Sequence, residues 1–203
     1  MKQIEALRQL ESLGNHGFET RDAAALLRVT QGNANKILGR LEDSGFLVHV
    51  ARGRWLPSRN VARNVLPELI AAPYPAYVSL QSALFLHGLI EQMPSVIYAV
   101  TLGRPRRVTT GIGTVSFHRM PPDLFSGFEV SADGAKIATA EKALFDTLYL
   151  APGRSRLFAH LPELEIPRGF RWAQLQSHLQ RVKSPVRRKF IADRIESLRD
   201  VER

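Results

Sequence analysis

The sequence contains no cysteine, which excludes several kinds of site. No disulfide, thiolate nucleophile or cysteine-ligated zinc can form without this residue. Reduced proteins are typical of the cytoplasm, where disulfides are rare, and we therefore expect a cytoplasmic protein.

Long hydrophobic runs are also absent. The longest uncharged apolar stretches, such as Ser95–Gly103, are far shorter than the roughly 20 residues that a membrane-spanning helix needs. The chain opens with Met1–Glu5, which places an acidic residue where a signal peptide has its apolar core. We expect a protein that is neither secreted nor bound to a membrane.

Motifs that carry catalysis are missing as well. The six histidines show no spacing typical of a metal site, and there is no phosphate-binding loop or nucleophile elbow. Gly111-Ile112-Gly113 lacks the third glycine of a nucleotide fingerprint, and Glu141 and Asp146 are five residues apart on an expected helix, hence on different faces. We expect no enzyme, and therefore no catalytic residue, metal or cofactor.

What the sequence does have is positive charge, 28 Lys and Arg against 19 Asp and Glu, or +9. Residues 1–60 carry 9 basic and 6 acidic side chains, residues 61–150 carry 7 of each, and residues 151–203 carry 12 and 6. An excess of this kind favours nucleic acid, an anionic membrane or an acidic protein as partner, or it serves solubility alone. The neutral middle indicates the core of a second domain.

Residues 1–60 have the pattern of a winged helix-turn-helix domain. Apolar residues recur at helical spacing in three segments, and Thr20 and Thr30 stand where they can cap the second and third helices. Arg28-Val29 leaves only a short turn between those two helices. In such domains the last helix enters the major groove of DNA.

The third helix has a polar face opposite its apolar stripe. Amide side chains can pair with adenine edges, and Lys or Arg can contact guanine or phosphate. Gly32 and Gly39 lie on that face and would let a DNA backbone approach closely, although each costs a helix about 1 kcal/mol relative to alanine. The candidate DNA-binding residues of this helix are Gln31, Asn33, Asn35, Lys36 and Arg40.

A hairpin follows this helix directly. Two β-rich runs flank Arg52-Gly53-Arg54, and Gly53 can adopt the positive φ of a tight turn. The position is that of a wing, so we expect Arg52 and Arg54 to reach phosphates or the minor groove.

The rest of the chain, residues 61–203, predicts an α+β domain with a small, mainly antiparallel sheet. The whole protein is thus expected to be mixed α/β, with each domain folding by itself. Expected strands are Ser95–Gly103, Gly113–Arg119 and a third around Phe128–Ser131. Expected helices are Leu66–Ala72, one capped by Ser79, Ile137–Leu150 capped at Thr139, Trp172–Gln180 and Ser184–Leu198.

Arg104, Arg106 and Arg107 cluster in the connection between the first two of these strands. They form a candidate anion or partner site, with a solvated surface as the alternative. The basic residues near Pro185 are open to the same two interpretations.

Three phrases together resemble the AbiEi family of antitoxins and transcriptional regulators from type IV toxin–antitoxin, or abortive-infection, operons. They are the Arg52-Gly53-Arg54 turn, Tyr77–Leu84 with His87-Gly88-Leu89, and Ala138–Asp146. They follow the family's order, and the resemblance extends over nearly the whole chain.

The resemblance implies a winged helix that represses the protein's own operon by binding double-stranded operator DNA with inverted repeats. It also implies a C-terminal domain that antagonises a nucleotidyltransferase-like toxin without a stable complex. The family has no strict catalytic motif, and Lys36, Arg40, Arg52 and Arg54 correspond in role to its basic winged-helix surface.

Two other classes stay open from the residues alone. A ligand-sensing repressor would bind a small molecule through residues 66–203, because pockets and cores are lined by the same apolar residues. A nucleic-acid-directed enzyme would assemble its site from residues remote in sequence.

Overall fold

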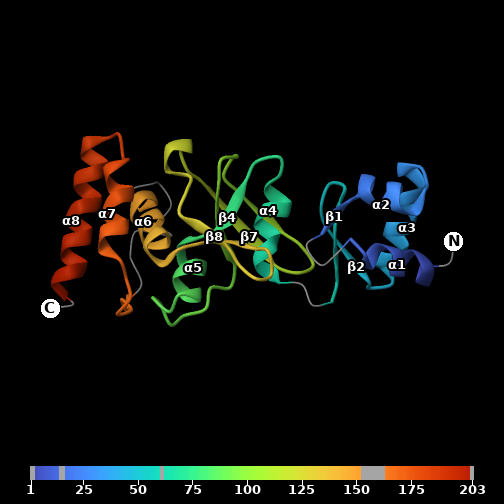
Figure 1. The fold of residues 1–203 in the computed structure, drawn as a ribbon, viewed down its shortest axis with the longest axis horizontal. Coiled ribbons are helices and arrows are strands. Elements are labelled where there is room, and N and C mark those ends of the chain that lie inside the picture. The colour runs from blue at the N-terminus through green and yellow to red at the C-terminus, as the bar shows by residue number, and fades with distance from the viewer. Residues whose placement is uncertain (1–2, 14–16, 60–61, 152–162, 202–203) are drawn as a thin grey trace.

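The computed structural model describes residues 3–13, 17–59, 62–151 and 163–201 (Figure 1). Over these residues the chain forms eight α-helices and nine strands in two sheets, so the expectation of a mixed α/β protein is confirmed. The expected domain boundary between residues 60 and 61 lies outside the described residues. The first three helices and three strands form one end of the elongated molecule, and the last two helices form the other (Figure 1).

Three short helices and a three-stranded sheet make up the N-terminal unit, residues 3–59. The helices are α1 (Gln3–Glu11), α2 (Thr20–Leu27) and α3 (Gln31–Asp43). The strands are β1 (Phe18–Glu19), β2 (Leu47–Ala51) and β3 (Arg54–Pro57), in the antiparallel order β1-β3-β2. Their core contains Leu10, Leu38, Leu41 and Trp55, as the helical spacing of the apolar residues requires.

The two threonines expected to cap helices differ in what they do. The Thr30 hydroxyl accepts from the Asn33 N–H at 3.3 Å and caps α3 as predicted. Thr20 is not a cap, because Glu19 takes that position and exchanges hydrogen bonds with Asp22. The buried Thr20 hydroxyl instead accepts from the Trp55 indole N–H at 2.9 Å, so a tertiary contact replaces the predicted local one.

The second sheet has six strands and is larger than the small sheet that we expected. Its order is β6-β7-β5-β4-β9-β8, with three antiparallel pairs and two parallel ones, β5 with β7 and β4 with β9. The strands are β4 (Ala76–Val78), β5 (Ile97–Thr101), β6 (Arg106–Thr109), β7 (Thr114–Arg119), β8 (Phe128–Val130) and β9 (Lys136–Ala138). Strands β4, β6 and β9 were missed because three or four residues show no clear alternation.

Five helices and two short 3-10 turns accompany this sheet (Figure 1). They are η1 (Arg63–Val65), α4 (Leu66–Ala71), α5 (Leu80–Leu86), η2 (Pro122–Leu124), α6 (Ala140–Leu150), α7 (Trp172–Gln180) and α8 (Pro185–Val201). Helices α5 and α6 pack with Tyr77, Tyr98 and Val100 on one face of the sheet, and α7 and α8 continue that core outward. The Thr139 cap is confirmed, because its hydroxyl accepts from the Lys142 N–H.

The opposite face of the sheet shares a core with the N-terminal unit. Val50 of β2 and Leu56 of β3 belong to one buried cluster with Ile70 of α4 and Phe117 of β7. Residues on both sides of residue 60 therefore bury apolar surface against each other, and burial of a side chain such as Leu56 contributes about 1.5–3 kcal/mol.

Helix α6 contains a fully buried ion pair. Lys142 bonds Asp146 one turn further along the helix, and both side chains have zero exposure. The second carboxylate oxygen of Asp146 accepts from the Tyr77 hydroxyl at 2.9 Å and from the Ser79 hydroxyl at 2.8 Å. Ser79 therefore does not cap α5 with its side chain, although it stands at the cap position. Burial raises the pKa of Asp146, an effect that Lys142 and the two hydroxyls oppose.

We predict that Lys142→Met lowers the free energy of unfolding by about 3–5 kcal/mol, because it leaves the Asp146 carboxylate buried without a cation. Urea unfolding measures the loss. The double variant Lys142→Met, Asp146→Asn should lose less than the single one, because the amide oxygen still accepts from Tyr77 and Ser79 and carries no charge. Lys183→Met, which breaks the exposed pair with Asp123, is the control and should change nothing measurable. A double variant less stable than the single one would contradict this account.

Candidate nucleic-acid interface

Helix α3 presents one polar face to solvent. Its Ala34, Leu38 and Leu41 are buried in the N-terminal unit, which turns the other side of the helix outward. The α3 face, as we call it, consists of the exposed residues Gln31, Asn33, Asn35, Lys36 and Arg40. Within the described ranges none of these five side chains makes a hydrogen bond or ion pair, so their donors and charges are available to a partner.

The two glycines of α3 leave room at this face. A Cβ atom built at Gly32 or at Gly39 would meet no atom within 4 Å outside its own helix. Packing within the protein therefore does not require glycine at either position, although each lowers the helix propensity. The fold thus gives no reason for glycine at these two positions, whereas close approach of a partner's backbone would give one.

Arg52 lies at the turn between β2 and β3, which follows α3 in the chain. Gly53 adopts φ +68° there, and its carbonyl accepts from the Thr20 N–H at 2.8 Å, which fastens the turn to the start of α2. The Arg52 side chain is exposed and has no hydrogen bond or ion pair among the described residues. It adds a further exposed cationic group to the N-terminal unit, at the turn that follows α3 in the chain.

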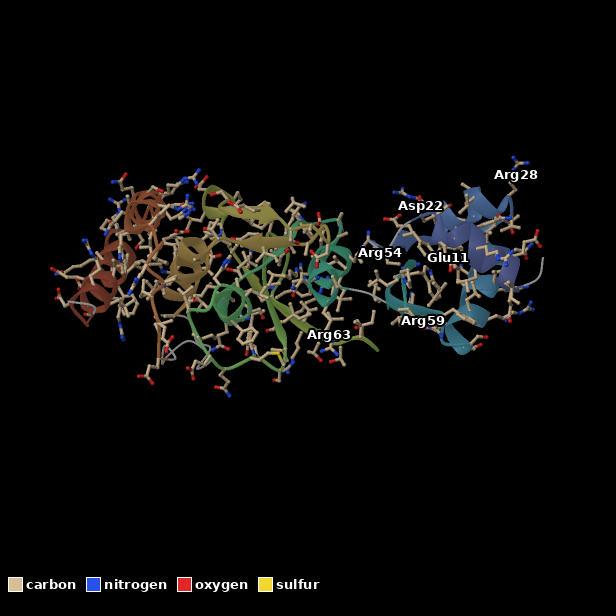
Figure 2. All side chains as sticks on the ribbon, turned by 60° about the horizontal axis from the view of Figure 1, so that its bottom comes forward. Glu11, Asp22, Arg28, Arg54, Arg59 and Arg63 are labelled. Atoms are coloured by element: carbon tan, nitrogen blue, oxygen red, sulfur yellow. The ribbon has the colours of Figure 1, made fainter. Side chains whose placement is uncertain are left out.

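Arg54 occupies a different environment from Arg52. Its guanidinium donates to the carbonyls of Leu69 at 3.0 Å and Ala72 at 3.1 Å, and it pairs with Glu19 at 3.3 Å. Carbonyls in the last turn of a helix lack helical partners and favour a cation, so Arg54 caps the C-terminal end of α4. Figure 2 shows Arg54 at the junction between the N-terminal unit and the rest of the chain. Its donors are therefore used within the protein, and we leave Arg54 out of the candidate interface.

Arg28 is an exposed cation that the sequence analysis did not select. It ends α2 in the left-handed conformation, with φ 54°, two residues before the Thr30 cap of α3. It has no ion pair within the described part of the chain, and Figure 2 shows it at the outer end of the N-terminal unit. Its position in the turn before the third helix is the signal that could have identified it.

The three arginines proposed as an anion site do not form one cluster. Neighbours on a strand point to opposite faces, so Arg106 and Arg107 of β6 are separated by the sheet. The Arg106 guanidinium donates to the Ile70 carbonyl at 2.8 Å and stacks on Phe117 at 5.4 Å. Arg104 lies near Arg106 at a small hollow, whereas Arg107 pairs in register with Ser116 on β7.

One serine and histidine are in contact in the second sheet. Ser116 Oγ lies 3.1 Å from His118 Nε2, and burial lowers the pKa of His118 to about 4. Residues two apart on a strand share a face, so the contact follows from the strand itself.

Within the ranges that the structure describes, no group of three His, Asp or Glu side chains could hold a metal ion. His16 and His160 lie outside those ranges. No described helix is long and apolar enough to cross a membrane.

Comparison with known proteins assigns no family to the chain. No protein-family model matches the chain, and no curated protein sequence matches it. The case for a nucleic-acid interface therefore rests on the described side chains.

We predict that Arg54→Ala destabilises the protein by about 1–3 kcal/mol, because two carbonyls and Glu19 lose their donor. Thermal or urea unfolding measures this loss. Arg52→Ala removes the same side chain two residues earlier, from an exposed site where no described residue is its partner, and should leave stability unchanged. Equal stability of the two variants would contradict the role assigned to Arg54.

Gly39→Ala should stabilise the protein by up to about 1 kcal/mol, because alanine favours a helix and the added methyl group meets no atom. If a DNA backbone approaches here, the same variant should bind DNA more weakly. Unfolding and DNA affinity are measured on one preparation. A more stable variant with unchanged or tighter DNA binding would remove the role that we assign to this glycine.

Proposed function

We propose that the protein is a DNA-binding antitoxin and autorepressor of the AbiEi type, with residues 1–60 acting as a winged helix-turn-helix. The element order α1-β1-α2-α3-β2-β3 and the sheet order β1-β3-β2 support the winged-helix interpretation. In this interpretation α3 is the recognition helix and the β2–β3 turn is the wing.

The observation that carries the DNA-binding proposal is the set of polar side chains on the α3 face, together with Arg52, that have no partner among the described residues. Amides such as Asn35 can donate to and accept from adenine, and Lys36 and Arg40 can contact guanine or phosphate. Arg52 at the wing would contact phosphate or the minor groove. Arg28, before the third helix, is added to these contacts, and Arg54 is removed from them because its donors are occupied.

The antitoxin part of the proposal is supported by the resemblance of three sequence phrases, two of which meet in the fold. Tyr77 and Ser79 from one phrase bond Asp146 from the other, which makes the pattern one packed unit of residues. This unit lies among the elements that follow residue 60. We propose that this part of the chain antagonises a nucleotidyltransferase-like toxin.

We predict that Lys36→Ala, Arg40→Ala and Arg52→Ala, combined, weaken binding to a duplex taken from upstream of the protein's own gene. The plot of log K against log salt should flatten by about 0.9 for each phosphate contact that is lost. Fluorescence anisotropy at several salt concentrations measures both quantities. The combined variant Arg104→Ala, Arg107→Ala, Arg119→Ala loses the same charge from exposed positions of the second sheet and is the control. Equal effects of the two variants would contradict a specific role for the α3 face and Arg52.

The same variants separate the two proposed activities in cells. Each is expressed beside the adjacent toxin gene and a reporter driven by the protein's own promoter. Loss of Lys36, Arg40 and Arg52 should release the reporter and leave protection from the toxin intact. If that variant also fails to protect while its level in the cell is unchanged, neutralisation runs through DNA binding and the second activity is refuted.

A further inference from the structure

A hollow of about 440 Å³ opens beside α1 in the N-terminal unit. Its apolar lining includes Leu7 of α1, Phe18 of β1, and Phe46 and Pro57 at the start of β2 and the end of β3. Phe46 is 39 % exposed, so a large aromatic ring stands at the hollow with much of its surface in water. We call this site the α1 hollow.

An apolar side chain projects from the same helix next to the hollow. Ile4 is 69 % exposed, one of the most exposed large apolar side chains that the structure describes. It lies three residues before Leu7 and seven before Glu11, which places all three along one stripe of α1. The stripe thus carries a protruding apolar residue and, from about 5 to about 10 Å further along the helix, the apolar hollow.

Two charges of opposite sign border the α1 hollow. Glu11 and Arg59 both line it, and in the described part of the chain neither makes an ion pair or side-chain hydrogen bond. Figure 2 labels both residues on the N-terminal unit. Among the described residues, the surface therefore offers a carboxylate and a guanidinium without partners beside apolar groups.

We propose that this surface binds a second copy of the chain around a twofold axis. A twofold contact needs a self-complementary patch, in which residue i meets residue j and j meets i. Here Ile4 of each copy enters the α1 hollow of the other, and Glu11 pairs with Arg59 of the partner subunit. One patch supplies both the projection and the hollow, and both the anion and the cation.

A small apolar ligand is the competing occupant, because the volume falls in the range of ligand sites. Such a ligand would fill the hollow but leave Ile4 in water. A second copy covers Ile4 and the hollow together and pairs both charges, which is why we favour it.

None of the residues proposed to contact DNA lines the α1 hollow. A dimer formed there would carry two copies of α3 related by a twofold axis, as an inverted repeat requires. That consequence rests on the proposed function, whereas the dimer itself does not.

Sedimentation velocity of the full chain without DNA, over a series of protein concentrations, tests the dimer. We expect a concentration-dependent dimer whose dissociation constant rises at least about tenfold in Ile4→Glu, a change of about 1.4 kcal/mol. An acidic residue in the first turn of a helix is compatible with the helix dipole, so this variant should fold. Val186→Glu is the matched control, because Val186 is 82 % exposed in the first turn of α8, and it should dimerise like the wild type.

Charge reversal tests the pairing independently of Ile4. Glu11→Arg and Arg59→Glu should each weaken the dimer about tenfold, because every contact occurs twice around the axis and like charges then face each other. The double variant restores opposite charges and should return to within about threefold of the wild type.

Four results would overturn the proposal. They are a chain that stays monomeric at every concentration, a dimer that Ile4→Glu leaves unchanged, a double reversal that is no tighter than the single ones, and native mass spectrometry that finds a retained small molecule on a monomer. Because DNA is absent from these measurements, their failure would leave the DNA-binding proposal standing.

Discussion

Asp146 is fully buried in α6, and its charge must be balanced by groups of the protein because water does not reach it. Lys142 from the same helix supplies the cation, while the hydroxyls of Tyr77 in β4 and of Ser79, the residue before α5, supply hydrogen bonds. The need to balance the Asp146 charge thus brings β4, the start of α5 and α6 together at this carboxylate. It also explains why these polar residues lie among the apolar ones that pack the core.

A residue with a strained backbone lies next to this network. Leu80 follows Ser79 and adopts φ +55°, a conformation that costs a leucine about 1–2 kcal/mol. Its side chain is fully buried, and the hydroxyl of its neighbour is tied to Asp146, so the surrounding contacts keep the backbone in this conformation. The sheet, α5 and α6 are thus held together by these contacts, and the rest of the chain packs against them.

The N-terminal unit packs against the second sheet and α4 through Arg54 and a shared apolar core. Arg54 caps α4 from β3, and Leu56 packs with Ile70 and Phe117. Two arginines of one hairpin therefore have different roles. Arg52 at the turn has no partner among the described residues, whereas Arg54, next to the turn, fastens this end of the hairpin to α4.

Features set by local periodicity could be predicted from the sequence. The buried stripe and Thr30 cap of α3, the Thr139 cap of α6 and the bounds of α7 follow from side chains a few residues apart. Features set by distant partners could not. Thr20 bonds Trp55, Ser79 bonds Asp146, and Arg54 reaches α4, although each residue type fitted a local role in the sequence. The short strands β4, β6 and β9 form because neighbouring strands pair with them, which no pattern of three or four residues records.

The most direct test of the account is a nuclear magnetic resonance titration of the full chain with the duplex from upstream of its own gene. The account predicts that backbone amide shifts change most over Gln31–Arg40 and at Arg52 and Gly53, and little over Leu69–Ala72, whose carbonyls Arg54 holds. Shifts concentrated in α8, with those of α3 unchanged, would contradict it and would place the nucleic-acid surface at the other end of the molecule.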